Sequence, residues 1–409
     1  MNKRNFWQAM TSKQHFTVFL LGISSGLPYL LLGSTLRLWF KNVNIDIKTI
    51  GASTLVMLPY TWKFIWAPVL DRYQLPFLDR RRGWIILFQI SLAISLFILG
   101  QISPETHTLL MLSMATVCAF FSSSQDIVID AYRREILPDE ELGLGSSLAV
   151  TGYRIGMLFA TSLAPILSDH IPWGQVYTVM SAIMAICTIP TFFAPKIENN
   201  IPAPTSLYAS VVEPIKDYFN RKNAIGILIF ILLYKIGDSM ASGLFKTFYS
   251  DIGYSNTQIG AIAGPIGIWA AIIGGILGGI LQMKIGLKKC LWYFGILQAI
   301  STALFALLTI YAPSLIALGL VIFFETFTSG LGTAAYSAFM ASLTNKKFTA
   351  TQYALLTSIM SIPAIFLGSS SGFIKEQIGW GGFFIFCAII ALPGILMLLR
   401  FEKWQTIPN

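Results

Sequence analysis

The sequence has little of the material from which enzyme active sites are built. Its 409 residues include three histidines and four cysteines, and only 11% of them are charged. His15, His107 and His170 stand apart from one another, and no Ser or Cys lies beside a plausible base. A glycine-rich phosphate loop is also missing. These absences argue against an enzyme and against an ATP-driven pump.

The positions of the four cysteines argue against a disulfide framework and against a metal site. Cys118, Cys187, Cys290 and Cys387 all fall in, or at the ends of, apolar segments, and their spacing suggests no pairing within a loop. The sequence therefore indicates neither a disulfide framework nor a metal site.

Apolar residues are abundant instead. They make up 55% of the chain, and its mean hydropathy of +0.68 is too high for a soluble protein of this size. Twelve stretches have the length needed to cross a bilayer. They predict an all-α membrane protein with spans at 16–40, 49–70, 84–103, 108–132, 143–168, 173–194, 223–249, 256–282, 289–311, 313–342, 348–374 and 380–400.

The net charge of +9 has a topological explanation and does not require a nucleic-acid partner. Of the 28 Lys and Arg residues, only Lys41, Lys48 and Lys375 fall in the odd-numbered connections between spans. Most of the others lie at the termini or in the even-numbered connections. Because cytoplasmic loops are enriched in Lys and Arg, this bias places both termini in the cytoplasm.

The spans divide into two halves of six. We expect an N-terminal bundle at 1–195, a polar cytoplasmic linker at 196–222 that includes a short surface helix, and a C-terminal bundle at 223–409. Aligning the halves superposes Arg37 on Lys246, which is typical of a transporter built from two related repeats.

The connection between the second and third spans carries a recognisable motif. It contains Asp71-Arg72-Tyr73 and then Arg80-Arg81-Arg82. This loop resembles the signature loop of the major facilitator superfamily, and the resemblance implies that Asp71, Arg72, Arg80, Arg81 and Arg82 form a cytoplasmic latch. The alternative is that the basic residues only set topology, as they do in most membrane proteins.

A second resemblance is carried by three segments within the spans. They are Ser124-Gln125-Asp126-Ile127-Val128-Ile129-Asp130-Ala131-Tyr132, Gly152-Tyr153-Arg154-Ile155-Gly156-Met157 and Tyr234-Lys235-Ile236-Gly237-Asp238. Together with Leu137-Pro138-Asp139-Glu140-Glu141-Leu142-Gly143 and the Asp71-Arg72-Tyr73 loop, they resemble the AmpG family of muropeptide permeases, whose larger members carry extra apolar segments. The resemblance implies import of N-acetylglucosaminyl-anhydromuramyl peptides across the bacterial inner membrane, driven by the proton gradient with no other cofactor.

The charged residues within the spans are the main functional candidates. Charge in a bilayer is costly unless it is paired or lines a water-filled path. The acids Asp126, Asp130, Asp238 and Glu325 are candidates for proton coupling, and the cations Lys63, Arg154 and Lys235 for substrate binding. They can alternatively be internal pairs that only hold helices together.

Further binding candidates lie near the outer ends of spans or beside Lys63. Arg37 and Lys246 can receive an anionic group, or can extend to the interface as long side chains do. Trp62 and Trp66 can stack on a sugar whose hydroxyls meet Gln125, or can pack against lipid or a neighbouring helix. The expected partners are an anionic sugar peptide and membrane lipids, and we expect a monomer.

Two other functions are compatible with the same residues. Within transport, the cargo can be another anionic solute, such as a peptide, a siderophore or an acyl coenzyme A. Outside transport, the protein can be a sensor that binds muropeptides without moving them. The sensor is less favoured, because the sequence outside the predicted spans leaves little room for a signalling domain.

The predicted topology can be tested by labelling from the two sides of the membrane. We expect single cysteines at Lys41→Cys and Lys346→Cys, in a cysteine-free background, to react with an impermeant maleimide from opposite faces. Labelling of both from the same face would contradict the assignment.

Overall fold

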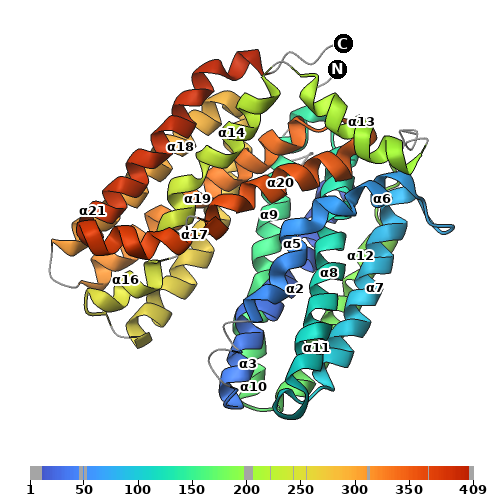
Figure 1. The fold of residues 1–409 in the computed structure, drawn as a ribbon, viewed down its shortest axis with the longest axis horizontal. Coiled ribbons are helices and arrows are strands. Elements are labelled where there is room, and N and C mark those ends of the chain that lie inside the picture. Colours follow the sequence, from blue (N-terminus) through green and yellow to red (C-terminus); the bar gives the residue numbers. More distant parts are fainter. Residues whose placement is uncertain are drawn as a thin grey trace. The chain divides into compact units, whose positions relative to one another are not determined.

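The computed structural model describes residues 12–404 apart from 46–48, 50–52, 198–205, 222, 243, 255, 311–313 and 367. Within these residues the secondary structure is helical, in agreement with the prediction (Figure 1). The helices pack into two units. Unit 1 holds residues 1–214 and 344–358, and unit 2 holds 215–343 and 359–409.

Unit 1 contains the first half of the chain and one late segment. Its helices are α2 (Lys13–Leu30), η1 (Leu31–Thr35), α3 (Leu36–Asn42), η2 (Ser53–Met57), α5 (Leu58–Trp62), η3 (Lys63–Ile65), α6 (Ala67–Arg72), α7 (Arg80–Gly100), α8 (Pro104–Ile136), η4 (Asp139–Glu141), α9 (Leu142–Leu158), η5 (Phe159–Leu163), α10 (Ala164–Ser168), α11 (Trp173–Ile186), α12 (Thr188–Phe192) and η7 (Lys346–Phe348). The first parts of α13 (Leu207–Phe219) and α20 (Thr349–Phe366) also belong to it.

Unit 2 contains the rest of α13 and α20 together with the later helices. These are α14 (Ala224–Tyr234), α15 (Ile236–Ser242), α16 (Phe245–Asp251), α17 (Asn256–Ile285), α18 (Leu287–Leu304), η6 (Phe305–Thr309), α19 (Leu315–Ser342), α21 (Gly368–Met397) and η8 (Leu398–Lys403). The units are groups of residues that pack together, so the predicted boundaries at 195 and 222 stay a prediction.

The spans follow most of the apolar stretches, but two of the twelve, at 49–70 and 348–374, are not among the long apolar helices of the described residues. In the second of these, α20 ends at Phe366, and α21 begins at Gly368 and continues into the last predicted span. Ten helices in the described part of the chain are long and apolar enough to cross a membrane. The stretch predicted at 49–70 is instead a series of short turns, η2, α5, η3 and α6. Pro59 and Pro68 lie within it, and proline lacks the N–H that a continuous helix requires.

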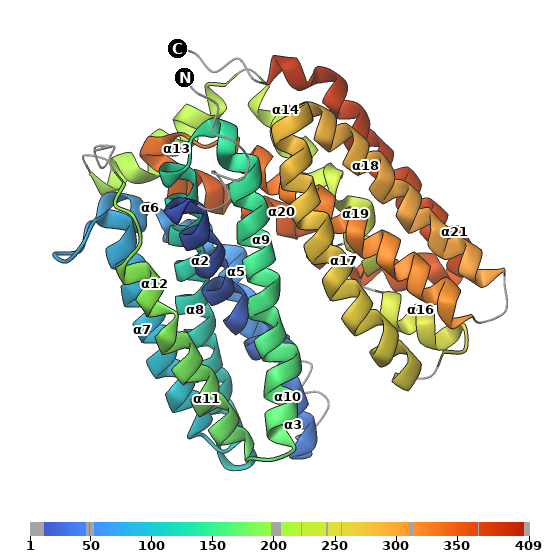
Figure 2. The ribbon, with the colours of Figure 1, turned by 180° about the vertical axis from the view of Figure 1, so that it is seen from behind.

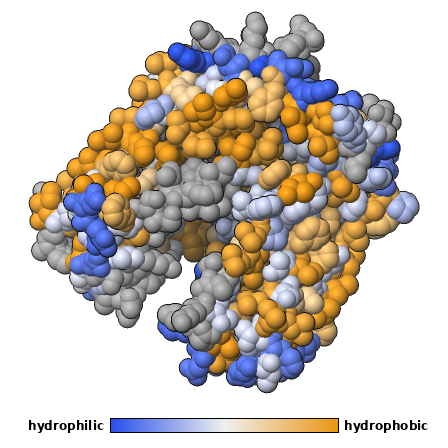
Figure 3. Space-filling model, in the orientation of Figure 1, coloured by the Kyte–Doolittle hydropathy of each residue, from blue (hydrophilic) through white to orange (hydrophobic). Residues whose placement is uncertain are grey.

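The outer surface of unit 1 is suited to lipid. On α7, Ile90, Ile94 and Phe97 recur on one face and are each about half exposed, at 46%, 55% and 47%. Figure 3 shows hydrophobic side chains along the unit 1 helices and hydrophilic ones gathered near their ends. This distribution is expected when the middle of each helix contacts hydrocarbon.

Glycines bring two helix pairs into backbone contact. In unit 1, α2 lies against α9, and in unit 2, α17 lies against α19, as both views of the ribbon show (Figures 1 and 2). A Cβ atom added at Gly26 would lie 1.9 Å from the Tyr153 carbonyl oxygen, and one at Gly152 would lie 2.1 Å from that of Phe19. Only glycine allows this separation, as in other closely packed membrane helices.

We therefore expect Gly26→Ala to lower the free energy of unfolding by about 1–3 kcal/mol, because the added methyl group forces α2 away from α9. Gly264→Ala on α17 is the matched control, because a Cβ there meets nothing within 4 Å. Thermal unfolding of the detergent-solubilised protein measures the difference. Equal unfolding temperatures for the two variants would contradict this packing argument.

Candidate functional site

Asp126 is the centre of a polar cluster in unit 1. It lies on α8, and the Ser25 hydroxyl of α2 donates a hydrogen bond to its Oδ1. Lys63, on the short turn η3, is 8% exposed and acts electrostatically on Asp126. The break in the second span therefore brings a cation toward an acid on the fourth.

Three tyrosines lie near this acid. Tyr29 lies on α2, Tyr60 on α5 and Tyr153 on α9, and all three are within electrostatic range of Asp126. The ring centroids of Tyr29 and Tyr60 are 5.2 Å apart in an edge-to-face arrangement, and those of Tyr29 and Tyr153 are 6.1 Å apart. The three rings are partly exposed, so they form an amphipathic surface beside a charge.

Sequence reasoning missed these tyrosines. One signal was present, because Tyr29 follows Ser25 by one helical turn and so shares its face. Tyr60 comes from a different span, and its hydroxyl donates to Ser122 on α8 at 2.7 Å. No pattern along the chain reveals that pairing.

The predicted sugar-binding residues are divided between core and surface. Gln125 is fully buried, and its Nε2 donates to Ser24 at 3.4 Å. Trp66 is partly buried, and its Nε1 donates to Ser124 at 2.9 Å. Trp62 is 55% exposed. In this structure Gln125 and Trp66 join helices, and Trp62 is the one of the three whose ring is most available.

The other charged candidates of unit 1 lie in different surroundings. Asp130 pairs with Arg133 at 3.1 Å, and Arg133 also donates to the Tyr353 hydroxyl at 2.8 Å. Arg37 on α3 and Arg154 on α9 are partly exposed. Asp130 therefore has its own cation, one turn away from Asp126.

A second polar cluster surrounds Glu325 in unit 2. This acid lies on α19 and is 2% exposed. Its Oε2 accepts from the Ser301 hydroxyl at 2.5 Å, and its Oε1 accepts from Gln298 Nε2 at 2.9 Å. Both donors lie on α18, whose Thr302 hydroxyl is also 3.4 Å from Oε2. Hydroxyls and an amide, which carry no charge, therefore solvate this buried carboxylate.

Gln298 links this acid to an ion pair on the seventh span. Its Nε2 also donates to Asp238 Oδ1 at 3.2 Å, and Asp238 Oδ2 lies 2.9 Å from Lys235 Nζ. Lys246 is in α16, but its side chain lies outside the described residues. Two acids and one cation thus share a connected network, in which uptake of one proton would balance the charge.

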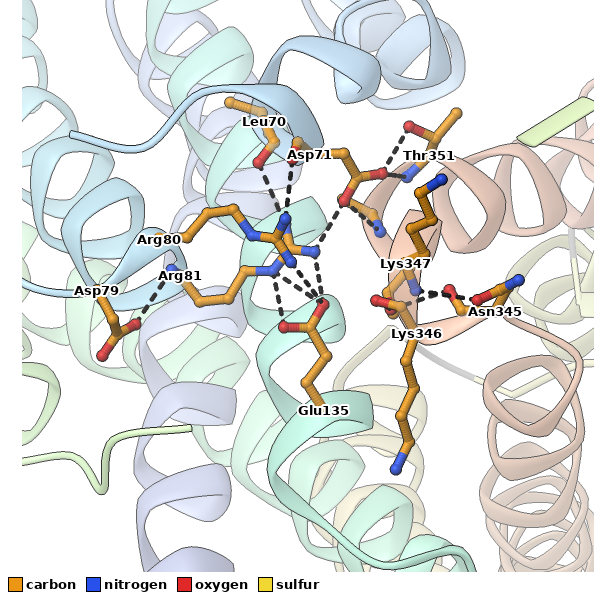
Figure 4. Close-up of polar contacts among 12 residues, drawn as sticks. Leu70, Asp71, Asp79, Arg80, Arg81, Glu135, Asn345, Lys346, Lys347 and Thr351 are labelled. Carbon is orange, nitrogen blue, oxygen red and sulfur yellow. Dashed lines mark hydrogen bonds and ion pairs between the residues drawn. The ribbon is translucent and has the colours of Figure 1, made fainter. Parts of the chain in front are cut away.

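Asp71 and Arg81 form a third cluster, at the end of the second span (Figure 4). Arg81 is 1% exposed, and it lies 2.8 Å from Asp71 Oδ1 and 2.5 Å from Glu135 Oε1. It also donates to the Leu70 carbonyl at 3.2 Å. The guanidinium supplies several donors in a fixed plane, so one side chain binds both carboxylates.

The same Asp71 carboxylate caps the start of α20. Its Oδ2 accepts from the Thr351 backbone N–H at 2.8 Å and from the Thr351 hydroxyl at 2.7 Å, while Oδ1 accepts from the Ala350 N–H at 3.2 Å. The first N–H groups of a helix have no partner within it, and they attract negative charge. Asp71 thus holds a distant part of the chain against α6.

Arg80 also joins this cluster, because its Nη2 lies 3.9 Å from Glu135 Oε1, whereas the other residues of the predicted latch make different contacts. Arg80 donates to the Asp71 carbonyl at 3.1 Å, and Arg72 stacks over Tyr73. Arg82 pairs with Asp79, which also caps α7, and it donates to the Ala194 carbonyl at 2.7 Å. The prediction omitted Glu135 and Thr351, which complete the cluster.

The chain matches known proteins along most of its length. The model of the Major Facilitator Superfamily matches residues 16–368 and 227–406. An anhydromuropeptide permease of Escherichia coli (strain K12) is 41% identical over 384 residues, which cover 93% of this chain and 78% of that protein. A putative transporter AmpG 4 of Rickettsia conorii is 35% identical over 94% of this chain and 95% of its own length.

Solved structures agree on the fold at low sequence identity. The superfamily transporter FucP, in its outward conformation, gives a TM-score of 0.72 at 13% identity and covers 97% of this chain and 100% of its own. The human organic anion transporter MFSD10 gives 0.71 at 14% identity, covering 94% of this chain and 99% of its own.

The Asp71 cluster yields a stability prediction. We expect Arg81→Met to lower the free energy of unfolding by about 3–5 kcal/mol, because it leaves two buried carboxylates without their shared cation. Arg81→Lys should recover only part of the loss, because one ammonium cannot bind both acids as the guanidinium does. Arg72→Gln, at a partly exposed position, is the control.

Thermal unfolding of the purified Arg81 and Arg72 variants measures these differences in stability. An Arg81→Met variant that unfolds at the wild-type temperature would show that the cluster does not stabilise the structure.

Proposed function

The chain belongs to the major facilitator superfamily and within it to the AmpG family, and on that premise we propose that it imports anhydromuropeptides across the bacterial inner membrane, driven by the proton gradient. Membership confirms the predicted fold class and the predicted family. The protein is a multi-pass membrane transporter of a small molecule and not an enzyme.

The observation that carries the proposed cargo is the similarity to the Escherichia coli anhydromuropeptide permease along 93% of the chain. The residues of unit 1 supply suitable chemistry. Tyrosine faces can pack against the apolar side of a sugar ring, and phenolic hydroxyls and Asp126 can bond its hydroxyl groups. Lys63, Arg37 and Arg154 are the proposed partners of the carboxylates of the lactyl-peptide part.

Two acids support the proposed proton coupling. Glu325 is enclosed in a low-dielectric part of unit 2 and is held by neutral donors. Asp126 has Lys63 and three partly exposed tyrosines nearby. We therefore assign the coupling proton to Glu325 and a substrate-linked role to Asp126. Asp238 and Asp130, which already have cations, act as their charge partners.

Release of Lys235 is the proposed link between proton and cargo. When Glu325 is charged, Gln298 donates to both acids, and Asp238 holds Lys235. Protonation of Glu325 removes its negative charge and so weakens the hydrogen bond that it accepts from Gln298. Gln298 can then donate a stronger hydrogen bond to Asp238. Lys235 is then available to an anionic cargo. Both termini lie in the cytoplasm in this proposal, and the monomer needs no cofactor.

Uptake in liposomes tests the proposal. We expect an inward proton gradient to drive accumulation of radiolabelled anhydromuropeptide by the wild type and not by Glu325→Gln. The same variant should still exchange labelled for unlabelled cargo without a gradient, because a permanently neutral side chain imitates the protonated state. Asp126→Asn should impair both uptake and exchange.

Glu105→Gln, at an exposed acid in the first turn of α8, is the matched control and should behave as wild type. Failure of active wild-type preparations to accumulate the cargo would reject the muropeptide. Wild-type gradient dependence in Glu325→Gln would reject Glu325 as the coupling acid.

A further inference from the structure

The first and fifth spans each contain one π-helical turn. In the first span, η1 (Leu31–Thr35) separates α2 from α3, and in the fifth, η5 (Phe159–Leu163) separates α9 from α10. Such turns are rare, widen the helix by one residue, and often occur at functional positions. They follow directly after the part of α2 and α9 where glycines keep the backbones in contact.

A hydrogen bond joins the two turns. The Thr35 hydroxyl in η1 donates to the Ala160 carbonyl oxygen in η5 at 2.7 Å. Thr35 is 2% exposed and Ala160 is fully buried. The residues around them, including Leu31, Leu36 and Ala164, belong to one hydrophobic cluster. The bond is therefore shielded from water. A hydrogen bond is stronger in such a low-dielectric interior than in water.

The sequence of η5 explains why Ala160 accepts from another span. The Ala164 N–H bonds to the Phe159 carbonyl five residues earlier, as π geometry requires. The next donor in that pattern would be residue 165, which is proline and has no N–H. The Ala160 carbonyl thus loses its π-helical partner, and the Thr35 hydroxyl takes that place.

A second hydroxyl reinforces the first-span turn. Tyr177 on α11 is fully buried, and its hydroxyl donates to the Leu31 carbonyl at 2.9 Å. The turn in the first span is thereby fixed on one side to the sixth span and on the other to the fifth. The Thr35 and Tyr177 hydroxyls therefore fix where the π-turn lies in the first span, and the Thr35 bond does the same for the π-turn in the fifth span.

We propose that the two π-turns form a single hinge in unit 1, in which Thr35 makes the outer segments α3 and α10 move together. Inside the hinge, backbone contact keeps α2 and α9 rigid. Outside it, the segments turn as one body. Arg37 lies two residues beyond Thr35, so Thr35 is a positioning residue for this cation. This last step depends on the proposed function, whereas the hinge does not.

Distances between spin labels test the hinge directly. With the natural cysteines replaced, labels at Lys41→Cys on α3 and Ile166→Cys on α10 occupy exposed positions in the outer segments. We expect Thr35→Val to broaden their distance distribution, because the shape is kept and the hydroxyl is lost. Thr35→Ser should retain the wild-type distribution. A Thr35→Val distribution as narrow as that of the wild type would overturn the proposal.

Two further variants separate coupling from stability. Thr161→Val removes a hydroxyl that donates within its own helix, to Met157 at 2.9 Å, and should leave the distribution unchanged. Pro165→Ala, combined with Thr35→Val, restores a backbone donor for Ala160 without rejoining the spans. Thr35→Val alone should lower the unfolding temperature, because it leaves the Ala160 carbonyl without a donor. The double variant should regain the wild-type unfolding temperature, while its distance distribution stays as broad as that of Thr35→Val. A narrow distribution would show that Thr35 only satisfies a carbonyl, and would overturn the proposal.

Uptake kinetics test the link to Arg37. We expect Thr35→Val to raise the KM for anhydromuropeptide several-fold while kcat changes less, because Arg37 is less well positioned. An unchanged KM together with a broadened distribution would overturn the role in binding. If the wild type does not transport this cargo, the proposed function fails, and the label distances still decide the hinge.

Discussion

Satisfying polar groups without water is the constraint on which the rest of this structure depends. A bilayer offers no hydrogen bonds, so each buried donor and acceptor needs a partner from the chain. Asp71 finds one in a helix terminus and an arginine, and Glu325 in a serine and a glutamine. The helix contacts that join distant spans are consequently made at the same residues as the candidate functional clusters.

The same constraint explains which parts of the site were predictable. Charged residues in apolar stretches stand out in a sequence, and pairs one helical turn apart, such as Lys235 with Asp238 and Asp130 with Arg133, follow from helical geometry. Partners from other spans do not follow. Glu135, Gln298 and Ser25 have unremarkable neighbours in the sequence, and only the packing of helices makes them ligands of a charge.

The fold shows a similar division. The apolar stretches predicted the all-helical architecture and the positions of the long spans. Hydropathy averages over many residues, so it contained no sign of the π-turns at Leu31 and Phe159, and it presented residues 49–70 as one span. These irregularities depend on individual prolines and on hydroxyls donated from other spans. They are nonetheless what places Lys63 near Asp126 and joins the first span to the fifth.

The glycine contact between α2 and α9 also determines how the gene tolerates mutation. Glycine is the only residue without a Cβ atom, so every missense change in the codons for Gly22, Gly26, Gly152 and Gly156 introduces one where a backbone oxygen already lies within 2.4 Å. Conservative and radical replacements are alike in this respect. A population selected for loss of this transporter would thus find, at these four codons, a target in which every amino-acid change disturbs the same helix contact.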